Sequence, residues 1–242
     1  MRSLLFIGAH PDDESFFAAG TIARYASEGA RVTIVCATRG ERGATADLCS
    51  IEELPKVREQ ELRDAMRVLW VKDIHFFPYE DQKLQQAPIE DVRRALVEII
   101  RQSRPDLVFT FDPHGSNQHV DHIAIARFAS DALSAAADPR WYPESGAPFI
   151  PRRVLWPPPI ILFRQPPGTD LHVQPGVDFL IDTSAFAEQK TQALKAHRTQ
   201  FPGLKKLFFD DPNGRRTFNW EAFRIGWGAR PKNIPADDLF AE

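Results

Sequence analysis

The chain has 242 residues, 43% of them hydrophobic and 26% charged, which is typical of a globular protein with a large buried core. Its net charge of −3 argues against a nucleic-acid or membrane-surface partner, and its two cysteines match no zinc-ribbon, redox or disulfide pattern. No apolar run reaches membrane-spanning length and the N-terminal run is too short for a signal peptide, so we expect a cytoplasmic protein without membrane insertion.

The first half of the chain alternates strand-like and helix-like segments. Apolar runs of strand length occupy residues 3–9, 31–38, 73–78 and 106–112. Helical patterns cover residues 15–28, 51–69, 89–103 and 121–134. This alternation predicts an α/β fold, a Rossmann-like three-layer sandwich with a mostly parallel sheet. Ligands of such sheets bind at the carboxyl ends of the strands.

The second half of the chain begins with a concentration of prolines. We predict that residues 139–176 form an irregular, proline-rich flap over or beside the site, with at most a short strand in residues 156–168. A late strand is expected at residues 177–184 and a late helix at residues 185–197. Residues 201–242 are expected to form an aromatic, irregular tail, and we interpret the whole chain, 1–242, as a single domain.

Two segments concentrate side chains that bind metals. HPDDE, at residues 10–14, follows the first predicted strand, and HGSNQHVDH, at residues 114–122, follows a later one. Both segments can therefore reach the same edge of the sheet. Two histidines with one carboxylate are a common set of ligands for a divalent cation, and a site with open coordination positions is catalytic.

The spacing within each segment suits a shared ion. His10 and Asp13 are three residues apart on a turn that Pro11 stiffens, so both can face one ion. His119 and His122 are also three apart and share a face if a helix begins there. Both pairs therefore fit one metal site.

Several of these residues could instead have purely structural roles. The carboxylates at 12–14 could serve merely as caps of the following helix. Capping, however, does not need a histidine at the end of a strand. Asp121 can act as an N-cap and as a site residue at once. We interpret His114 as a turn residue, His75 as a core histidine and His197 as a satisfied helix histidine outside the site.

The two motifs together resemble a known family. AHPDDE followed by the HVDH box is similar to the LmbE-like, or PIG-L, family of zinc-dependent N-acetylglucosaminyl deacetylases. The segments TRGERG, VREQELRDAMRVLW, YEDQKL and KTQALKAHRTQ also fit that pattern. The resemblance covers about the first 135 residues and, more weakly, residues 178–200. Val120 departs from the family, which usually has proline there.

The resemblance implies a role for each matching residue. The zinc ligands are implied to be His10, Asp13 and His122. The catalytic residues are implied to be Asp12 as general base, His119 as the group that stabilises or protonates the tetrahedral intermediate, and Asp121 as the residue that orients His119. The sugar-contacting residues are implied to be Arg58, Glu41 and Asp81.

These roles agree with the needs of amide hydrolysis. Zinc lowers the pKa of bound water from about 15.7 to about 7 and polarises the carbonyl oxygen. Asp12 would be free to take the water proton and pass it to the leaving amine, because its neighbour Asp13 is the ligand. A protonated His119 would face the developing oxyanion, and loss of such a donor typically costs about 100- to 1000-fold in rate.

Each of the three sugar-contacting residues could also be an ordinary surface residue. Arg58 could be an exposed helix arginine paired with Glu61, one turn on. Glu41 could belong to a solvated turn, and Asp81 could be a common loop residue. These alternatives stay open at the level of the sequence.

The predicted function is that of a metal-dependent hydrolase that removes an N-acetyl or other N-acyl group from an amino sugar or its glycoside. The expected cofactor is Zn²⁺, although the same ligands also accept Fe²⁺ or cobalt.

The alternative functions are a hydrolase of a non-sugar amide or a phosphoester, and a non-catalytic carbohydrate-binding protein. Asp12 and His119 argue against the last, since holding zinc needs neither. A dinucleotide-binding module is disfavoured because HPDDE replaces the glycine-rich turn. The expected partner is a small-molecule amino sugar, and a homo-oligomer is left open.

Overall fold

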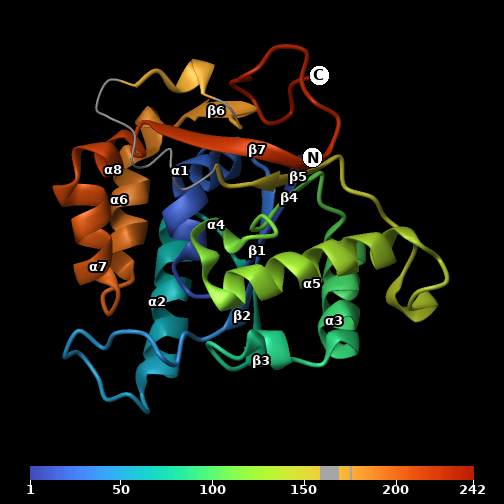
Figure 1. Cartoon of the computed structure of the whole chain (residues 1–242), viewed down its shortest axis with the longest axis horizontal. Coiled ribbons are helices and arrows are strands. Elements are labelled where there is room, and N and C mark those ends of the chain that lie inside the picture. The colour runs from blue at the N-terminus through green and yellow to red at the C-terminus, as the bar shows by residue number, and fades with distance from the viewer. Residues whose placement is uncertain (159–168, 175) are drawn as a thin grey trace.

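The computed structural model describes residues 1–158, 169–174 and 176–242 (Figure 1). In this part of the chain, seven strands form one sheet in the order β3-β2-β1-β4-β5-β7-β6. The parallel strands are β1 (Ser3–Gly8), β2 (Arg31–Thr38), β3 (Asp73–Tyr79), β4 (Leu107–Phe109) and β5 (Arg153–Trp156). The strand β7 (Trp220–Gly228) runs antiparallel to both β5 and β6 (Phe179–Asp182). The predicted α/β fold with a mostly parallel sheet is confirmed.

Helices cover both faces of the sheet. On one face α1 (Asp13–Ser27) and α2 (Leu54–Val68) both contact α6 (Ala187–Ala196), and on the other α3 (Ile89–Ser103) packs against α5 (Val120–Ala137) (Figure 1). Shorter helical segments are η1 (Leu84–Gln86), α4 (Gly115–Gln118), η2 (Pro143–Ser145), η4 (Leu171–Val173), η5 (Ser184–Phe186), α7 (Phe201–Lys205), η6 (Lys206–Asp210) and α8 (Pro212–Arg216).

The strand β1 lies at the centre of two hydrophobic cores. Leu5 and Ile7 pack in the core beneath α3 and α5, whereas Leu4 and Phe6 pack in the core beneath α1, α2 and α6. Alternate side chains of a strand point to opposite faces, so a run of apolar residues is what a strand covered on both sides requires. This burial fixes the point where β1 ends and the HPDDE segment begins.

The sheet continues through a range that was expected to be irregular. β5 lies inside residues 139–176 and pairs in parallel with β4. The prediction of an irregular flap is therefore wrong for residues 153–156, where four residues suffice for a strand between two neighbours. The rest of the expected short strand, in residues 159–168, lies outside the described residues.

The expected irregular tail supplies another strand. Within residues 201–242, β7 is nine residues long and lies between β5 and β6. Its Phe223 and the later Leu239 are both buried in the core beneath α1. The prediction of irregular chain is therefore wrong for this stretch, which forms a strand and packs on the core. In the described residues, no helix combines the length and the apolar character needed to cross a membrane.

Candidate active site

The two predicted motifs meet at the carboxyl edge of the sheet. His10 follows β1 directly, Asp13 begins α1, and His122 lies in the first turn of α5. His10 Nδ1 lies 3.2 Å from His122 Nε2, and His122 Nε2 lies 3.2 Å from Asp13 Oδ1. The other Asp13 oxygen, Oδ2, lies 3.9 Å from His10 Nδ1. Three buried side chains from two distant segments thus converge on one point.

The second nitrogen of each histidine faces an acceptor. His10 Nε2 lies 3.1 Å from Asp121 Oδ2 and 3.2 Å from Asp81 Oδ1. His122 Nδ1 lies 3.2 Å from the Gly115 carbonyl oxygen. Histidines that bind metals usually donate their other ring N–H to a carboxylate or carbonyl, which fixes the tautomer and the ring orientation.

The spacing of the donor atoms suits a small divalent cation. With bonds of about 2.0–2.1 Å, the ligand atoms of a tetrahedral zinc site lie about 3.3 Å apart. His10 Nδ1 and Asp13 Oδ1 each lie 3.2 Å from His122 Nε2. Donor types, spacing and outward-facing acceptors therefore all fit a metal ion.

Two other groups of donor atoms lie within 4.8 Å of one another. One is His10, His119 and His122, and the other is His10, Asp81, His119 and Asp121. Asp121, however, already accepts hydrogen bonds from the backbone N–H of Gln82 (2.6 Å) and Leu84 (3.1 Å) in addition to its contact with His10. Its carboxylate therefore lies behind His10 as an orienting group.

The arrangement of Asp121 differs from the expected one. His119 is the N-cap of α5, and its Nδ1 accepts a hydrogen bond of 3.2 Å from the Asp121 backbone N–H. Among the described residues, the Asp121 carboxylate has His10 as its ring partner and makes no hydrogen bond to the His119 ring. Asp121 thus contacts His119 through its backbone N–H, while the backbone at 82–84 holds its carboxylate toward His10. Burial, with the nearby charge of His10, lowers the pKa of His119.

Charges within the cluster shift its ionisation. Burial lowers the pKa of His10, but hydrogen bonds to Asp121 and Asp81 and the charge of Asp13 outweigh burial and raise this pKa to about 10. Burial would raise the pKa of Asp13, yet the neighbouring His122 and His10 hold it well below its usual range. Asp13 is therefore an ionised carboxylate that can neutralise part of a cation's charge.

The backbone of Asp12 is strained. Its φ is 130° and its ψ is −20°, a conformation that costs a non-glycine residue on the order of 1–3 kcal/mol. The Arg58 guanidinium holds this turn: it donates to the Pro11 carbonyl (2.6 Å), to Asp12 Oδ2 (3.2 Å) and to the Gly40 carbonyl (3.0 Å). Burial raises the pKa of Asp12, while the Arg58 charge opposes that rise.

The alternative of an exposed Arg58 paired with Glu61 is wrong. Arg58 is only 4% exposed, and Glu61 instead accepts hydrogen bonds from the backbone N–H (2.9 Å) and hydroxyl (2.7 Å) of Thr199. The two residues lie one turn apart on α2 but bind different partners. Arg58 therefore belongs to the site as a positioning group for Asp12.

A buried pair behind the turn was missed by sequence analysis. Glu14 accepts from the Asp12 backbone N–H (3.3 Å) and from the Ser15 hydroxyl (2.7 Å), and lies 3.1 Å from His197 Nε2. The His197 ring is fully buried, and its Nδ1 has no hydrogen-bond partner among the described residues. His197 at the end of α6 therefore supports the metal-binding turn, although its sequence context indicated only a structural role within its own helix.

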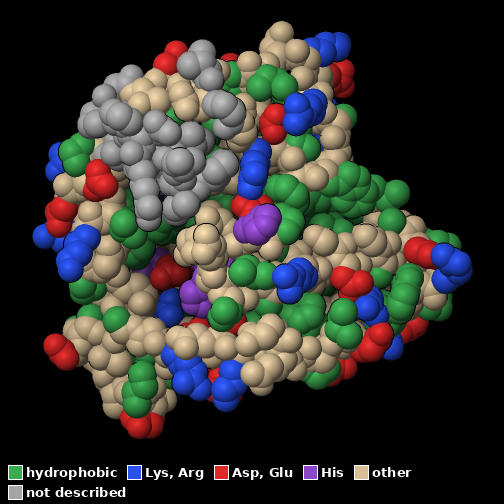
Figure 2. Space-filling model, in the orientation of Figure 1, with side chains coloured by type: hydrophobic (Ala, Val, Ile, Leu, Met, Phe, Trp, Pro, Cys, Tyr) green, Lys and Arg blue, Asp and Glu red, His purple; other side chains and the backbone are tan. Residues whose placement is uncertain are grey.

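A cleft of about 370 Å³ opens over these side chains. Figure 2 shows histidine, acidic and basic side chains together in a hollow of the surface. Residues that line the cleft beyond the predicted set are Phe16, Phe17, Arg42, Gly43, Gln82, Asn117, Gln200, Gly203, Leu204 and Leu207. They come from separate loops and helix ends, so no spacing in the sequence could reveal them.

The three predicted sugar-contacting residues have different locations. Arg58 and Asp81 line the cleft. Glu41 instead accepts hydrogen bonds from the backbone N–H of Arg39 (3.3 Å) and Asp81 (3.0 Å), and so supports the loop that carries Asp81. The structure brings two of the three to the cleft.

Two other histidine predictions have clear outcomes. His114 is a highly exposed turn residue before α4, as expected. His75 is half-exposed on β3 and lies 3.0 Å from Asp73, so the prediction of a core histidine is wrong. β3 is the edge strand of the sheet, which explains its partial exposure.

The topology and the side chains define an α/β protein with a histidine–carboxylate cluster that could hold a metal ion at the carboxyl edge of its parallel strands. The PIG-L family, described as GlcNAc-PI de-N-acetylase, matches residues 5–133, more than half of the chain. The chain belongs to this family, and the predicted resemblance is confirmed.

Relatives and solved structures agree with this assignment. A 1D-myo-inositol 2-acetamido-2-deoxy-alpha-D-glucopyranoside deacetylase from Streptomyces scabiei is 32% identical over 288 residues, covering 98% of this chain and 88% of the relative. The N,N'-diacetylchitobiose deacetylase from Pyrococcus horikoshii has a TM-score of 0.72 at 25% identity, covering 93% of this chain and 83% of that one. A conserved protein from Thermus thermophilus has a TM-score of 0.73 at 27% identity, covering 95% of this chain and 96% of that one.

Proposed function

We propose that this protein is a zinc-dependent hydrolase that removes the N-acetyl group from an amino sugar or from its glycoside. The observation that carries the proposal is the convergence of His10, Asp13 and His122 beside the carboxylate of Asp12. The names of the Streptomyces scabiei relative and of the Pyrococcus horikoshii protein support the choice of substrate, since both name the deacetylation of an acetylated amino sugar. The proposed partner is accordingly a small-molecule amino sugar.

His10, Asp13 and His122 would hold the ion. When bound, zinc would polarise the acyl carbonyl and acidify a water molecule. The carboxylates of Asp121 and Asp81 would keep the His10 ring in place through its Nε2. The chain supplies one carboxylate and two imidazoles, a set that suits both Zn²⁺ and Fe²⁺. Of these two ions we propose zinc.

Asp12 would act as the general base and acid. Its side chain is 22% exposed and lines the cleft, while Asp13 faces the histidines. An Asp12 carboxylate oxygen would accept the proton of the attacking water and then give it to the leaving amine. The strained backbone and Arg58 fix the direction of this carboxylate.

His119 would face the oxygen of the acyl group. It is half-buried in the cleft wall, with its ring centroid 4.7 Å from that of His10 and 5.0 Å from that of His122. Its Nδ1 is occupied by the backbone N–H of Asp121, which leaves Nε2 to donate to the developing oxyanion. For the sugar, Asp81 and Arg58 remain proposed contacts, and Arg42 replaces Glu41 because it lines the cleft.

Release of amine from a panel of N-acetylglucosaminides, with and without a chelator, tests the proposal. The metal-loaded protein should release amine, and the chelator should stop the reaction. Asp12→Asn should keep its metal by elemental analysis and lose at least about 100-fold in kcat, as expected for a missing general base. Asp47→Asn, at an exposed loop position, is the matched control and should behave as wild type.

Other outcomes contradict the proposal in distinguishable ways. Turnover of simple N-acetyl amides without turnover of any sugar would favour a non-sugar amidase. Sugar binding without amine release from metal-loaded protein would favour a carbohydrate-binding protein. Full metal occupancy in His10→Ala would refute the ligand assignment.

A further inference from the structure

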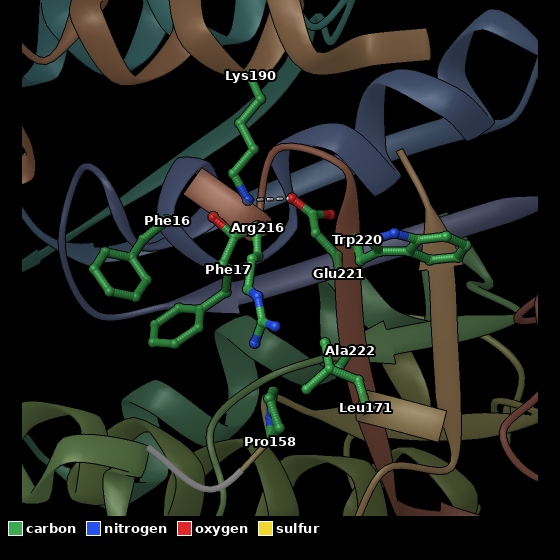
Figure 3. A pocket seen from close by; sticks show the side chains of 10 residues that line it. Phe16, Phe17, Pro158, Leu171, Lys190, Arg216, Trp220, Glu221 and Ala222 are labelled. Atoms are coloured by element: carbon green, nitrogen blue, oxygen red, sulfur yellow. Dashed lines mark hydrogen bonds and ion pairs between the residues drawn. The ribbon is translucent and has the colours of Figure 1, made fainter. Parts of the chain in front are cut away.

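A second cavity lies behind the wall of the cleft. This cavity, here called the annex, has a volume of about 50 Å³ and is lined mainly by Phe16, Phe17, Leu171, Arg216, Trp220 and Ala222 (Figure 3). Phe16 and Phe17 also line the catalytic cleft. The two consecutive residues of α1 therefore border both spaces.

The annex wall contains one buried ion pair that is already complete. Lys190 Nζ lies 2.6 Å from Glu221 Oε1, and both side chains are almost fully buried (Figure 3). Glu221 also accepts hydrogen bonds from the backbone N–H of Gly20 (3.0 Å) and Thr21 (2.8 Å). Both oxygens of the Glu221 carboxylate thus accept hydrogen bonds, and the Lys190–Glu221 pair adds no net charge to the annex.

Arg216 supplies a charge that has no such partner among the described residues. It is half-buried, and Figure 3 shows its guanidinium extending into the annex beside Phe17 and above Ala222. No residue of the described chain forms a hydrogen bond or ion pair with this guanidinium. An unpaired guanidinium in apolar surroundings attracts a planar anion, because its fork of donors matches a carboxylate.

A third cavity continues the annex outward. It has a volume of about 320 Å³ and shares Leu171, Arg216 and Trp220 with the annex. An aromatic ring fits a cavity of about 150 Å³, so the annex alone is too small but the two spaces together have room for one. The indole of Trp220 offers such a ring a face to pack against.

We propose that the annex and the cavity beside it form a subsite for a part of the substrate that is apolar and carries an acidic group. The proposal rests on the function proposed above, because it concerns the same substrate. The apolar part would pack on Phe17 and Trp220, and the acid would bind Arg216. Two parts of the substrate could carry such an apolar, acidic group: the aglycone of the sugar and an extended N-acyl chain.

Two pairs of probes distinguish these sources. The first pair is the 4-carboxyphenyl and the phenyl glycoside of N-acetylglucosamine. The second pair is the methyl glucosaminide with an N-succinyl or an N-butyryl group. For each pair, the ratio of kcat/KM from amine release and the ratio of Kd from calorimetry are measured. Each ratio is taken within one variant, so partial loss of folded protein cancels.

The wild-type protein should prefer the acidic member of one pair by about tenfold or more, as a charged hydrogen bond allows. Arg216→Gln should remove this preference, and Arg216→Lys should retain part of it. Arg127→Gln is the matched control at an exposed position on α5 and should keep the preference. A preference in the first pair assigns the subsite to the aglycone, and one in the second pair assigns it to the acyl chain.

Equal treatment of acidic and neutral members in both pairs would overturn the proposal, and so would a preference that survives Arg216→Gln. Failure of the proposed function gives a different result: the Kd ratio would depend on Arg216 while no variant released amine.

Discussion

Replacing Arg58 with glutamine tests how the metal-binding turn is held. The shorter, uncharged side chain would lose the hydrogen bonds to the Pro11 and Gly40 carbonyls and the ion pair with Asp12. A buried polar group left without its partner costs about 1–3 kcal/mol, and breaking a buried ion pair costs about 3–5 kcal/mol. These costs overlap, and Asp12 is 22% exposed, so solvent recovers part of the ion-pair loss. We expect a decrease of about 3 kcal/mol in the free energy of unfolding.

Urea unfolding of metal-saturated protein measures this loss directly. For a chain of this size, 3 kcal/mol corresponds to a decrease of about 6–12 °C in Tm. A double-mutant cycle with Asp12→Asn isolates the contact between the two side chains, and we expect a coupling energy of about 1–2 kcal/mol. Arg63→Gln, at an exposed position on the same helix, is the control and should change stability by less than about 0.5 kcal/mol.

The reasoning would fail if Arg58→Gln cost less than about 1 kcal/mol, the lower bound for one unpaired buried group. A coupling energy below about 0.5 kcal/mol, with a normal loss for each single variant, would show that Arg58 does not hold Asp12. Arg58 would then be a packing residue of α2, and the strained φ of Asp12 would need another cause.

Three further predictions concern metal binding and the core. Chelation should lower Tm, and zinc at about 100 times its Kd should restore about 2.7 kcal/mol; His122→Ala should remove this dependence on zinc in a thermal melt. Lys190→Met should cost about 3–5 kcal/mol in urea unfolding, since it leaves the Glu221 carboxylate buried without its cation; the added change Glu221→Gln should recover part of that loss. Gly20→Ala should destabilise the protein although alanine favours helices, because an added Cβ would lie 2.6 Å from Thr183 Cβ; unchanged stability in urea would contradict this packing.

Local patterns account for the elements that were predicted well. Residues 89–103 form a helix over the range expected, because Val92, Leu96 and Ile100 repeat on one face and Pro105 follows the end. β1 and β2 were recognisable for a related reason, since both faces of each strand are buried and the apolar run is continuous. In these elements the signal lies within the segment itself.

β5 and β7 were missed because their stability comes from distant partners. β5 has only four residues and is covered by β4 on one side and β7 on the other. β7 carries the buried Glu221, which is acceptable only because Lys190 and the α1 backbone are its partners. A charged residue within an apolar segment argues against a buried strand in sequence analysis, because its distant partner cannot be recognised there.

The site divides in the same way. The sequence predicted that the segments 10–14 and 114–122 would meet, because parallel strands bring their carboxyl ends to one edge. It could not predict that the Asp121 carboxylate would orient His10 and not His119, since the hydrogen bonds from the backbone at 82–84 decide that. Likewise, Glu41 does not line the cleft, because its carboxylate accepts a hydrogen bond from the Asp81 backbone N–H in the loop after β3.

The parts of the site that would hold the metal and the parts that would select the substrate have separate structural origins. The metal-binding turn is fixed by contacts from three helices: Glu14 on α1, Arg58 on α2 and His197 at the end of α6. The outer cleft wall comes from later segments such as α7, and the annex adds Arg216 of α8. Buried, multiply bonded contacts leave the turn little freedom to vary, and none of these three contacts comes from α7 or α8. Changes in α7 and α8 can therefore alter which group lies beside Phe16 and Phe17 without moving His10, Asp13 or His122.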